Sequence, residues 1–267
     1  MTLGVHQVDG RIAARNAVKI RAALRAGIDA KKIFADYQDS HPTNTGNTAQ
    51  DRARARAWSM IHINLDMTAF KQVLRRVYAE MYVTGQASTE EILRNLGSTK
   101  KAPEPSVVID WNNWKPGNQA AEALIRPPGG LQKLLNGIEI KSAQAADTSY
   151  NLLGTALADA FNIGASPTKA AKMIQDALAS PQRSLTIALT EGSRAANSAA
   201  IDSYRATGIE RIEWLSADPI NCACVDLNGE IVNLGDVFPS SDEGVTEPPE
   251  HPNCRCTTLP VSADFSD

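Results

Sequence analysis

All four cysteines of this chain, and one of its four histidines, lie close together near the C-terminal end. They form the pair Cys222-Ala-Cys224 and, after a turn-rich stretch, the segment His251-Pro-Asn-Cys254-Arg-Cys256. The preceding four-fifths of the chain contain no cysteine. Soft ligands gathered in this way bind a metal, form disulfides, or hold together a small module that has too little apolar core to fold alone.

Zinc suits this pattern because it takes four Cys or His ligands at fixed short distances, which two turns can supply as pairs. The candidate ligands are Cys222, Cys224, His251, Cys254 and Cys256, so five side chains compete for four places. Both cysteine pairs have the spacing C-x-C, and residues i and i+2 of an extended strand point to the same side and can chelate. A structural zinc ion, two disulfides formed after assembly, and free cysteines packed beside a hydrogen-bonded histidine all remain open.

The sequence does not favour an enzyme. His251 is close to Cys254 along the chain, whereas a catalytic Cys–His dyad normally comes from separate elements. The chain has no G-x-x-x-x-G-K-[ST], G-x-G-x-x-G or H-E-x-x-H motif. The spacing of Glu191 and Arg194 in a predicted helix indicates an ordinary i, i+3 ion pair. We therefore expect no catalytic and no cofactor-binding residues.

The composition favours packed helices with a real core. Hydrophobic residues make up 43 % of the chain, aromatic residues only 5 %, and alanine is abundant. No stretch approaches about 18 consecutive apolar residues, and the N-terminal segment lacks the apolar centre of a signal peptide, so we expect no contact with a membrane. In a reducing cytosol, clustered cysteines are more often metal ligands than disulfides.

Charge is unevenly distributed along the sequence. Residues 1–101 hold 16 Lys and Arg against 9 Asp and Glu, whereas residues 102–267 hold 11 against 21. The first part therefore carries a balance of +7 and the second a balance of −10. This asymmetry indicates either two surfaces with different partners or simply two solvated faces.

Apolar spacing and helix-stop residues predict a mainly α protein that ends in a small α+β module. Helices are expected over residues 10–35, 48–85, 88–97, 147–163, 167–178 and 181–207, the third of them opened by the capping box Ser88-Thr-Glu-Glu91. Residues 98–118, which include Trp111 and Trp114, are expected to form a hinge. Strand patterns follow at residues 209–215 and 256–261, and Asn228-Gly229 indicates a hairpin.

The C-terminal half resembles the Mu F-like minor head proteins of tailed phages, also called head-morphogenesis or minor capsid proteins. The residues that carry the resemblance are, in order, Thr190-Glu191, Tyr204, Gly208, Trp214, Cys222, Cys224, Leu227-Asn-Gly229 and Pro248-Pro-Glu-His251-Pro-Asn-Cys254-Arg-Cys256. The similarity extends from about residue 105 to residue 262. Members of this family usually carry the first cysteine pair as C-x-x-C, which would place a cysteine at Asn221. This departure makes Cys222 a weaker candidate ligand and favours His251.

The resemblance implies a non-enzymatic virion protein, and together with the charge and helix patterns it predicts three regions. These are a basic helical arm (1–101), the helical part of the Mu F-like domain (102–208) and a small α+β Cys/His module (209–267). Such proteins are packaged in few copies inside the capsid at the portal vertex, after a period in the host cytoplasm, and assist head assembly and DNA packaging or ejection. Some members carry a toxin domain after this region, which we do not expect here because the sequence stops at Asp267.

The implied partners are the portal protein and the major capsid or scaffolding proteins. The basic helices of residues 1–101 suit contact with packaged DNA or with an acidic portal surface. One rival class is an enzyme carried in the virion, ADP-ribosyltransferase-like or a protease, which an assay of NAD consumption or peptide cleavage would reveal. A DNA-binding regulator with a zinc knuckle is a third class, and the acidic residues around the ligands disfavour it.

Overall fold

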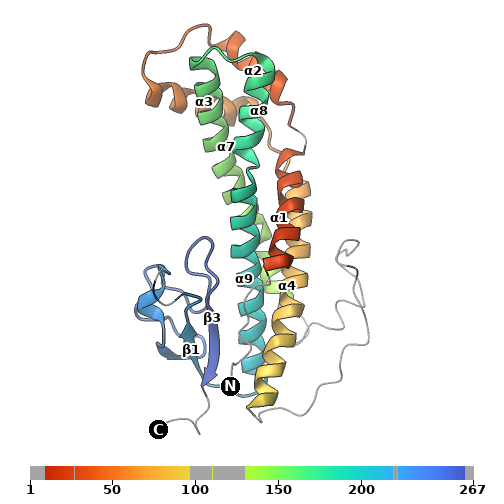
Figure 1. Cartoon of the computed structure of the whole chain (residues 1–267), viewed down its shortest axis with the longest axis vertical. Helices are drawn as coiled ribbons and strands as arrows, with labels where there is room; N and C mark the ends of the chain where they lie inside the picture. Colours follow the sequence, from red (N-terminus) through yellow and green to blue (C-terminus); the bar gives the residue numbers. More distant parts are fainter. Residues whose placement is uncertain are drawn as a thin grey trace. The chain divides into compact units, whose positions relative to one another are not determined.

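The computed structural model describes residues 10–26, 28–96, 110, 130–218, 220 and 222–261. Within these ranges the chain is mainly α-helical, with a small antiparallel sheet near the C-terminal end (Figure 1). The predicted fold class is confirmed. Apart from Asp110, the predicted hinge at 98–118 lies outside the described residues, as do its two tryptophans.

The elements have well-defined bounds. The helices are α1 (Gly10–Arg25), α2 (Ala30–Ser40), α3 (Thr48–His62), α4 (Thr68–Asn95), α6 (Gly130–Asn136), α7 (Ile138–Asn162), α8 (Pro167–Leu178) and α9 (Pro181–Ala206). The strands are β1 (Arg211–Leu215), β2 (Ile231–Asn233) and β3 (Thr257–Val261), with a short 3-10 helix, η1 (Val225–Leu227), between the first two. None of the helices in the described ranges is both long and apolar enough to cross a membrane.

The chain divides into two compact units, each built from separate stretches of sequence. Unit 1 comprises Met1–Ala17, Leu74–Gly137 and Leu185–Asp267, and unit 2 comprises Val18–Val73 and Ile138–Ser184. The division of the sequence at residues 101 and 208 concerns regions of different charge and composition, and it stays a prediction.

Unit 2 is a helical bundle made of α2, α3, α7 and α8. Its core is formed by aromatic and aliphatic side chains that include Phe34, Tyr37, Leu153, Leu157 and Ile174, all fully buried. Close packing requires a glycine on α7, because a Cβ atom at Gly154 would lie 2.6 Å from the backbone nitrogen of Arg56 on α3.

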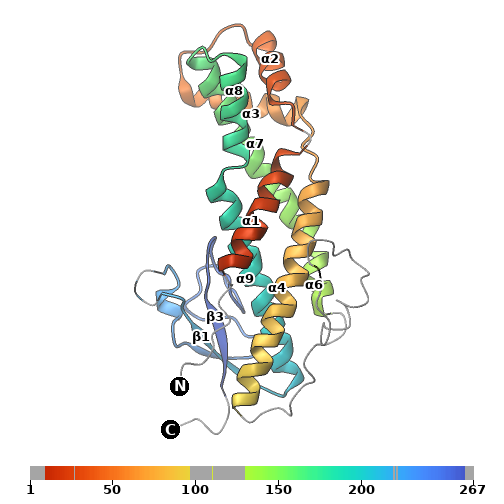
Figure 2. The ribbon, with the colours of Figure 1, turned by 45° about the vertical axis from the view of Figure 1, so that its right-hand side comes forward.

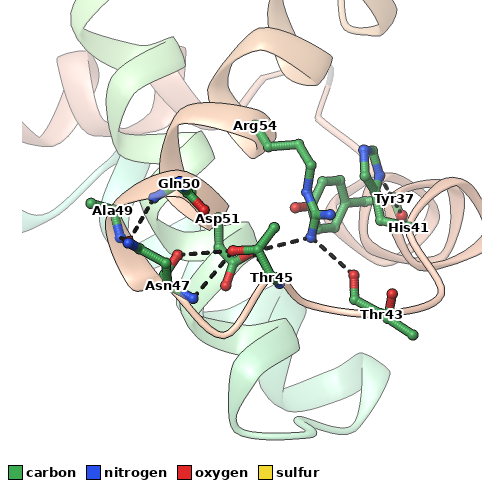
Figure 3. A network of polar contacts seen from close by, with 9 residues as sticks. All are labelled: Tyr37, His41, Thr43, Thr45, Asn47, Ala49, Gln50, Asp51 and Arg54. Carbon is green, nitrogen blue, oxygen red and sulfur yellow. Dashed lines mark hydrogen bonds and ion pairs between the residues drawn. The ribbon is translucent and has the colours of Figure 1, made fainter.

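The loop between α2 and α3 is held by a local polar network (Figure 3). The Asn47 side chain caps α3 by accepting hydrogen bonds from the backbone of Ala49 and Gln50. Asp51 accepts a hydrogen bond of 2.9 Å from the Thr45 backbone and pairs with Arg54 at 3.2 Å. The shape of this loop is therefore fixed by the first turn of the following helix.

In unit 1, α4 packs closely on α9. A Cβ atom at Gly85 would lie 2.6 Å from the Cα and carbonyl oxygen of Ala196, so the two backbones meet at this glycine. The hydroxyl groups of two buried tyrosines on α4 reach carboxylates on α9. Tyr78 donates to Glu191 and Tyr82 donates to Asp202, each at 2.6 Å.

The small sheet of unit 1 has the order β2-β1-β3, and both pairings are antiparallel. Ile212 lies opposite Val232 on one side and Pro260 on the other. Alternation along β1 buries Ile212 and Trp214 completely, as the sequence pattern predicted. These side chains form a second core with Tyr204, Phe238 and the buried cysteines.

Several predicted helix boundaries are wrong. The expected helix over residues 10–35 is two helices, and α2 begins after Asp29, whose side chain accepts a hydrogen bond from the backbone of Lys32. The expected helix over residues 48–85 is also two helices, separated by residues 63–67. Polar caps and turns that the apolar period does not reveal interrupt both segments.

The capping box at Ser88 does not start a helix, because α4 continues through it to Asn95. The hydroxyl groups of Ser88 and Thr89 donate to the carbonyl groups of Thr84 and Gly85, four residues earlier, so both residues belong to the helix interior. Residues 130–136 form α6, which the sequence did not predict, and α7 starts at Ile138 rather than near residue 147.

Later boundaries agree well with the sequence. α8 begins at Pro167 and ends at Leu178, as predicted, and Ser166 is its N-cap. The left-handed glycines Gly164 and Gly208 follow the ends of α7 and α9. The hairpin expected across Asn228-Gly229 has a different form, because η1 precedes this turn and β2 pairs with β1.

Candidate metal centre

The five candidate ligands lie on two segments of the Cys/His module. Cys222 and Cys224 follow β1, and Cys224 directly precedes η1. His251, Cys254 and Cys256 form the segment that leads into β3, which begins at the next residue. Inside this segment the Cys254 backbone donates to the His251 carbonyl at 3.2 Å, which makes a tight turn.

The side chains of these two segments converge. The Sγ atom of Cys222 is 3.6 Å from that of Cys256, and the Sγ atom of Cys224 is 3.8 Å from that of Cys254. The Nε2 atom of His251 is 3.5 Å from the Sγ atom of Cys222. Two triads, Cys222-Cys224-Cys256 and Cys224-His251-Cys254, have their ligand atoms within 4.8 Å of one another. The predicted site residues are thus brought together.

These distances match the dimensions of a tetrahedral zinc site. With Zn–S bonds of about 2.3 Å, the tetrahedral edge between two sulfur atoms is about 3.8 Å, and an edge from sulfur to a His nitrogen is slightly shorter. A disulfide bond would require about 2.05 Å between the sulfur atoms, whereas all four cysteines here are free thiols. The arrangement can therefore hold a metal ion.

Hydrogen bonding favours a thiolate at Cys254, although burial opposes it. Cys224, Cys254 and Cys256 are buried, whereas Cys222 is half-buried. Hydrogen bonds from Cys224 and Cys256 lower the pKa of Cys254, because they stabilise its thiolate. The same sharing of a proton raises the pKa of Cys224. A buried thiolate among thiols is the form that a divalent cation would bind.

His251 is oriented to present Nε2 to the sulfur atoms. Its Nδ1 atom lies 2.8 Å from the backbone carbonyl of Pro252. A carbonyl oxygen only accepts hydrogen bonds, so Nδ1 carries the proton and the Nε2 lone pair faces Cys222. Burial lowers the pKa of His251, but hydrogen bonds with Cys222 and the Pro252 carbonyl give a net increase in this pKa. Asn221, where the resemblance would place a cysteine, lies outside the described residues.

Sequence reasoning missed the supporting role of three α9 residues at this centre, although two of them, Thr190 and Tyr204, are among those that carry the resemblance. The Thr190 hydroxyl accepts a hydrogen bond of 2.8 Å from the Asn253 backbone, and the Asn197 amide donates to the Cys256 carbonyl at 3.1 Å. The Tyr204 hydroxyl donates to the Thr258 carbonyl at 2.9 Å. A signal was available, since these three polar residues recur every seven positions, on one face of an alanine-rich helix.

Comparison with known proteins gives a match to the part of the chain that contains this site. The fold and site define a helical protein whose long α9 helix carries a small three-stranded Cys/His module. Residues 151–259 match the family described as Phage Mu protein F like protein, so this part of the chain is similar to the Mu F-like family. The matched region contains all five candidate ligands. Comparison with curated proteins and with solved structures gives no match.

Proposed function

We propose that this protein is a non-enzymatic minor capsid protein of a tailed phage, bound to the portal inside the head. There it assists head assembly and DNA packaging or ejection. The observation that carries this proposal is the match of residues 151–259 to the Mu F-like family. Its expected partners are the portal protein and the major capsid or scaffolding proteins, with several copies per virion.

A structural zinc ion completes the Cys/His module in this proposal. Cys224, Cys254 and Cys256 are its most buried candidate ligands, with 0–1 % of their surface exposed. The fourth place goes to Cys222 or His251, whose ligand atoms lie 3.5 Å apart. When bound, zinc supplies a cross-link between the segment after β1 and the segment before β3.

The basic arm has less free charge on α3 than its sequence indicates. Arg52 pairs with Asp159, Arg54 with Asp51 and Arg56 with Asp147, all within unit 2 and at 3.0–3.2 Å. These pairs weaken the case for DNA contact through α3. The same pairs also leave less positive charge on α3 for an acidic surface of the portal protein, so both packaged DNA and the portal protein stay proposed partners of the arm.

Two measurements test the proposed role. Mass spectrometry of purified phage heads should detect the chain in both immature and mature particles, and the tagged full chain should capture the portal protein from a phage-infected lysate. Absence from both kinds of particle would refute the virion role. Capture that is lost at high salt would support the charged arm as the contact, and capture unaffected by salt would exclude it.

Elemental analysis tests the metal site. The purified full chain should contain about one zinc ion per molecule, and its four thiols should react slowly with a thiol reagent until a chelator is added. Metal-free protein with four readily accessible, independently reactive thiols would contradict the proposed zinc site, but it would leave the virion role unaffected.

A further inference from the structure

We propose that Thr190 and Asn197 of α9 are positioning residues for the Cys/His centre. Each forms a hydrogen bond with the backbone of a segment that carries candidate ligands, so α9 sets the geometry in which a metal ion is bound. This inference rests on the proposed zinc site and extends it beyond the five ligands to the helix beneath them. All of these residues belong to unit 1, and β3 lies beside α9 (Figure 1, Figure 2).

Thr190 supports the turn between His251 and Cys254. Its hydroxyl donates to the Thr186 carbonyl at 2.7 Å, so the oxygen lone pairs are left to accept from the Asn253 backbone at 2.8 Å. Asn253 has a φ angle of 64°, a left-handed conformation that residues other than glycine adopt at an energetic cost. The hydrogen bond from Asn253 to Thr190 helps to hold this strained turn.

Asn197 supports the end of the ligand segment, at Cys256. Its side chain is almost fully buried, and its amide nitrogen lies 2.9 Å from the Ser193 carbonyl and 3.1 Å from the Cys256 carbonyl. The hydrogen bond to Ser193, one turn earlier on the same helix, fixes the orientation of the Asn197 amide group. Asn197 therefore holds the carbonyl group of Cys256 at a fixed position against α9.

Tyr204 offers an internal comparison on the same face of α9. Its hydroxyl donates to the Thr258 carbonyl, which belongs to β3 and follows the last candidate ligand. This contact attaches the module to the same helix but does not involve the turn or the peptide of a ligand. If Thr190 and Asn197 merely attach the module, removal of any of the three contacts should have the same effect on metal binding.

A preformed ligand geometry strengthens metal binding, because less free energy is lost in ordering the ligands when the metal binds. Loss of such an outer contact typically lowers metal affinity by about 10–100-fold. We therefore expect Thr190→Val and Asn197→Asp to lower zinc affinity by about tenfold or more. Val keeps the shape of Thr without its hydroxyl, and Asp keeps the shape of Asn without its amide donor.

The experiment measures zinc affinity of the full chain by competition with a chromophoric chelator, and records the visible spectrum of the Co²⁺-loaded protein. Thr190→Ser should restore the parent affinity, because serine keeps the hydroxyl. Tyr204→Phe should lower the melting temperature and leave zinc affinity within about twofold of the parent, since it removes no ligand-segment contact. Changed Co²⁺ bands in Thr190→Val would indicate altered ligand geometry.

The possible outcomes separate this inference from the function on which it rests. A parent protein that binds no zinc would refute the proposed zinc site. A parent that binds zinc, with Thr190→Val and Asn197→Asp binding equally tightly, would overturn only the positioning role. Equal losses in Tyr204→Phe and Thr190→Val would also overturn it. If Thr190→Val does not fold, as judged by its circular dichroism spectrum, Asn197→Asp and Thr190→Ser decide the question.

Discussion

Asp51 is a carboxylate buried among partners from the start of α3 and the loop before it (Figure 3). The backbone hydrogen bond from Thr45 is the main reason that the pKa of Asp51 lies below its usual value, and Arg54 lowers this pKa further. A carboxyl group with a lowered pKa in the folded state stabilises the fold above its unfolded-state pKa. That contribution is lost as the pH falls through its folded-state pKa.

Asp51→Asn should therefore lower the melting temperature at neutral pH. The difference from the parent should shrink as the pH falls through the pKa of Asp51, where the parent carboxylate becomes protonated. Thermal unfolding followed by circular dichroism at several pH values measures this effect. The exposed Asp39 on α2 supplies the matched control, and Asp39→Asn should leave the melting temperature nearly unchanged. A constant difference between parent and Asp51→Asn at all pH values would contradict the explanation.

The Tyr78–Glu191 contact joins α4 to α9 inside unit 1. Tyr78 is fully buried, and burial together with the neighbouring Glu191 raises the pKa of its phenol group. Glu191 also accepts a hydrogen bond of 3.3 Å from Arg194. The ion pair predicted from the sequence is therefore present, and Tyr78 is a second donor to the same carboxylate. Hydrogen bonds to charged groups contribute about 1.5–3 kcal/mol.

Tyr78→Phe should lower the free energy of unfolding by about 1.5–3 kcal/mol, because it leaves a mostly buried carboxylate with one donor fewer. Urea denaturation measures the change. In the Glu191→Gln background the cost of Tyr78→Phe should be smaller, since the charge is gone. An equal cost in both backgrounds would indicate that the phenol group acts only through packing.

At the scale of elements, the contact between α4 and α9 depends on a glycine. Gly85→Ala gives a better helix former, which by itself favours the helix by about 1 kcal/mol. The added Cβ would nevertheless lie 2.6 Å from backbone atoms of Ala196, which cannot rotate away. Overpacking of this kind costs about 1–3 kcal/mol.

We expect Gly85→Ala to destabilise the protein in urea or thermal unfolding in spite of its better helix propensity. Gly10→Ala, at the start of α1, is the control, because nothing lies within 4 Å of its Cβ position. That variant should be neutral or slightly stabilising. A stabilised Gly85→Ala variant would show that the two helices can separate without cost.

At the scale of the whole molecule, the proposed zinc ion should stabilise one part of the chain only. All candidate ligands belong to unit 1, whereas the core around Phe34, Leu157 and Ile174 belongs to unit 2. Removal of the ion by a strong chelator should therefore expose the strands to hydrogen exchange and leave the exchange of α7 and α8 unchanged. Most of the far-ultraviolet helical signal should remain.

Hydrogen-exchange mass spectrometry with and without chelator measures this difference segment by segment. Re-addition of Zn²⁺ should restore protection of β1 and β3, and Mg²⁺ should not, because thiolate ligands disfavour it. Unchanged protection of the strands after verified loss of zinc would mean that the second core, with Trp214 and Phe238, suffices to hold the module.

The sequence determined the features that depend on local chemistry. Ser166-Pro167 fixed the start of α8, because a capping side chain and a proline at the first position both favour that boundary. Alternation predicted β1, and the Cys/His pattern indicated both the similarity to Mu F-like proteins and the five candidate ligands. Each of these patterns is close in sequence to the element or site that it predicts.

Only the tertiary structure decided the features that depend on distant partners. The pairing of β2 with β1 and the contact of Glu191 with Tyr78 each join residues that the local pattern does not relate. The support of the Cys/His segment by Thr190 and Asn197 crosses more than fifty residues of sequence. Packing between elements selects such contacts, and a single sequence records only the side chains available for them.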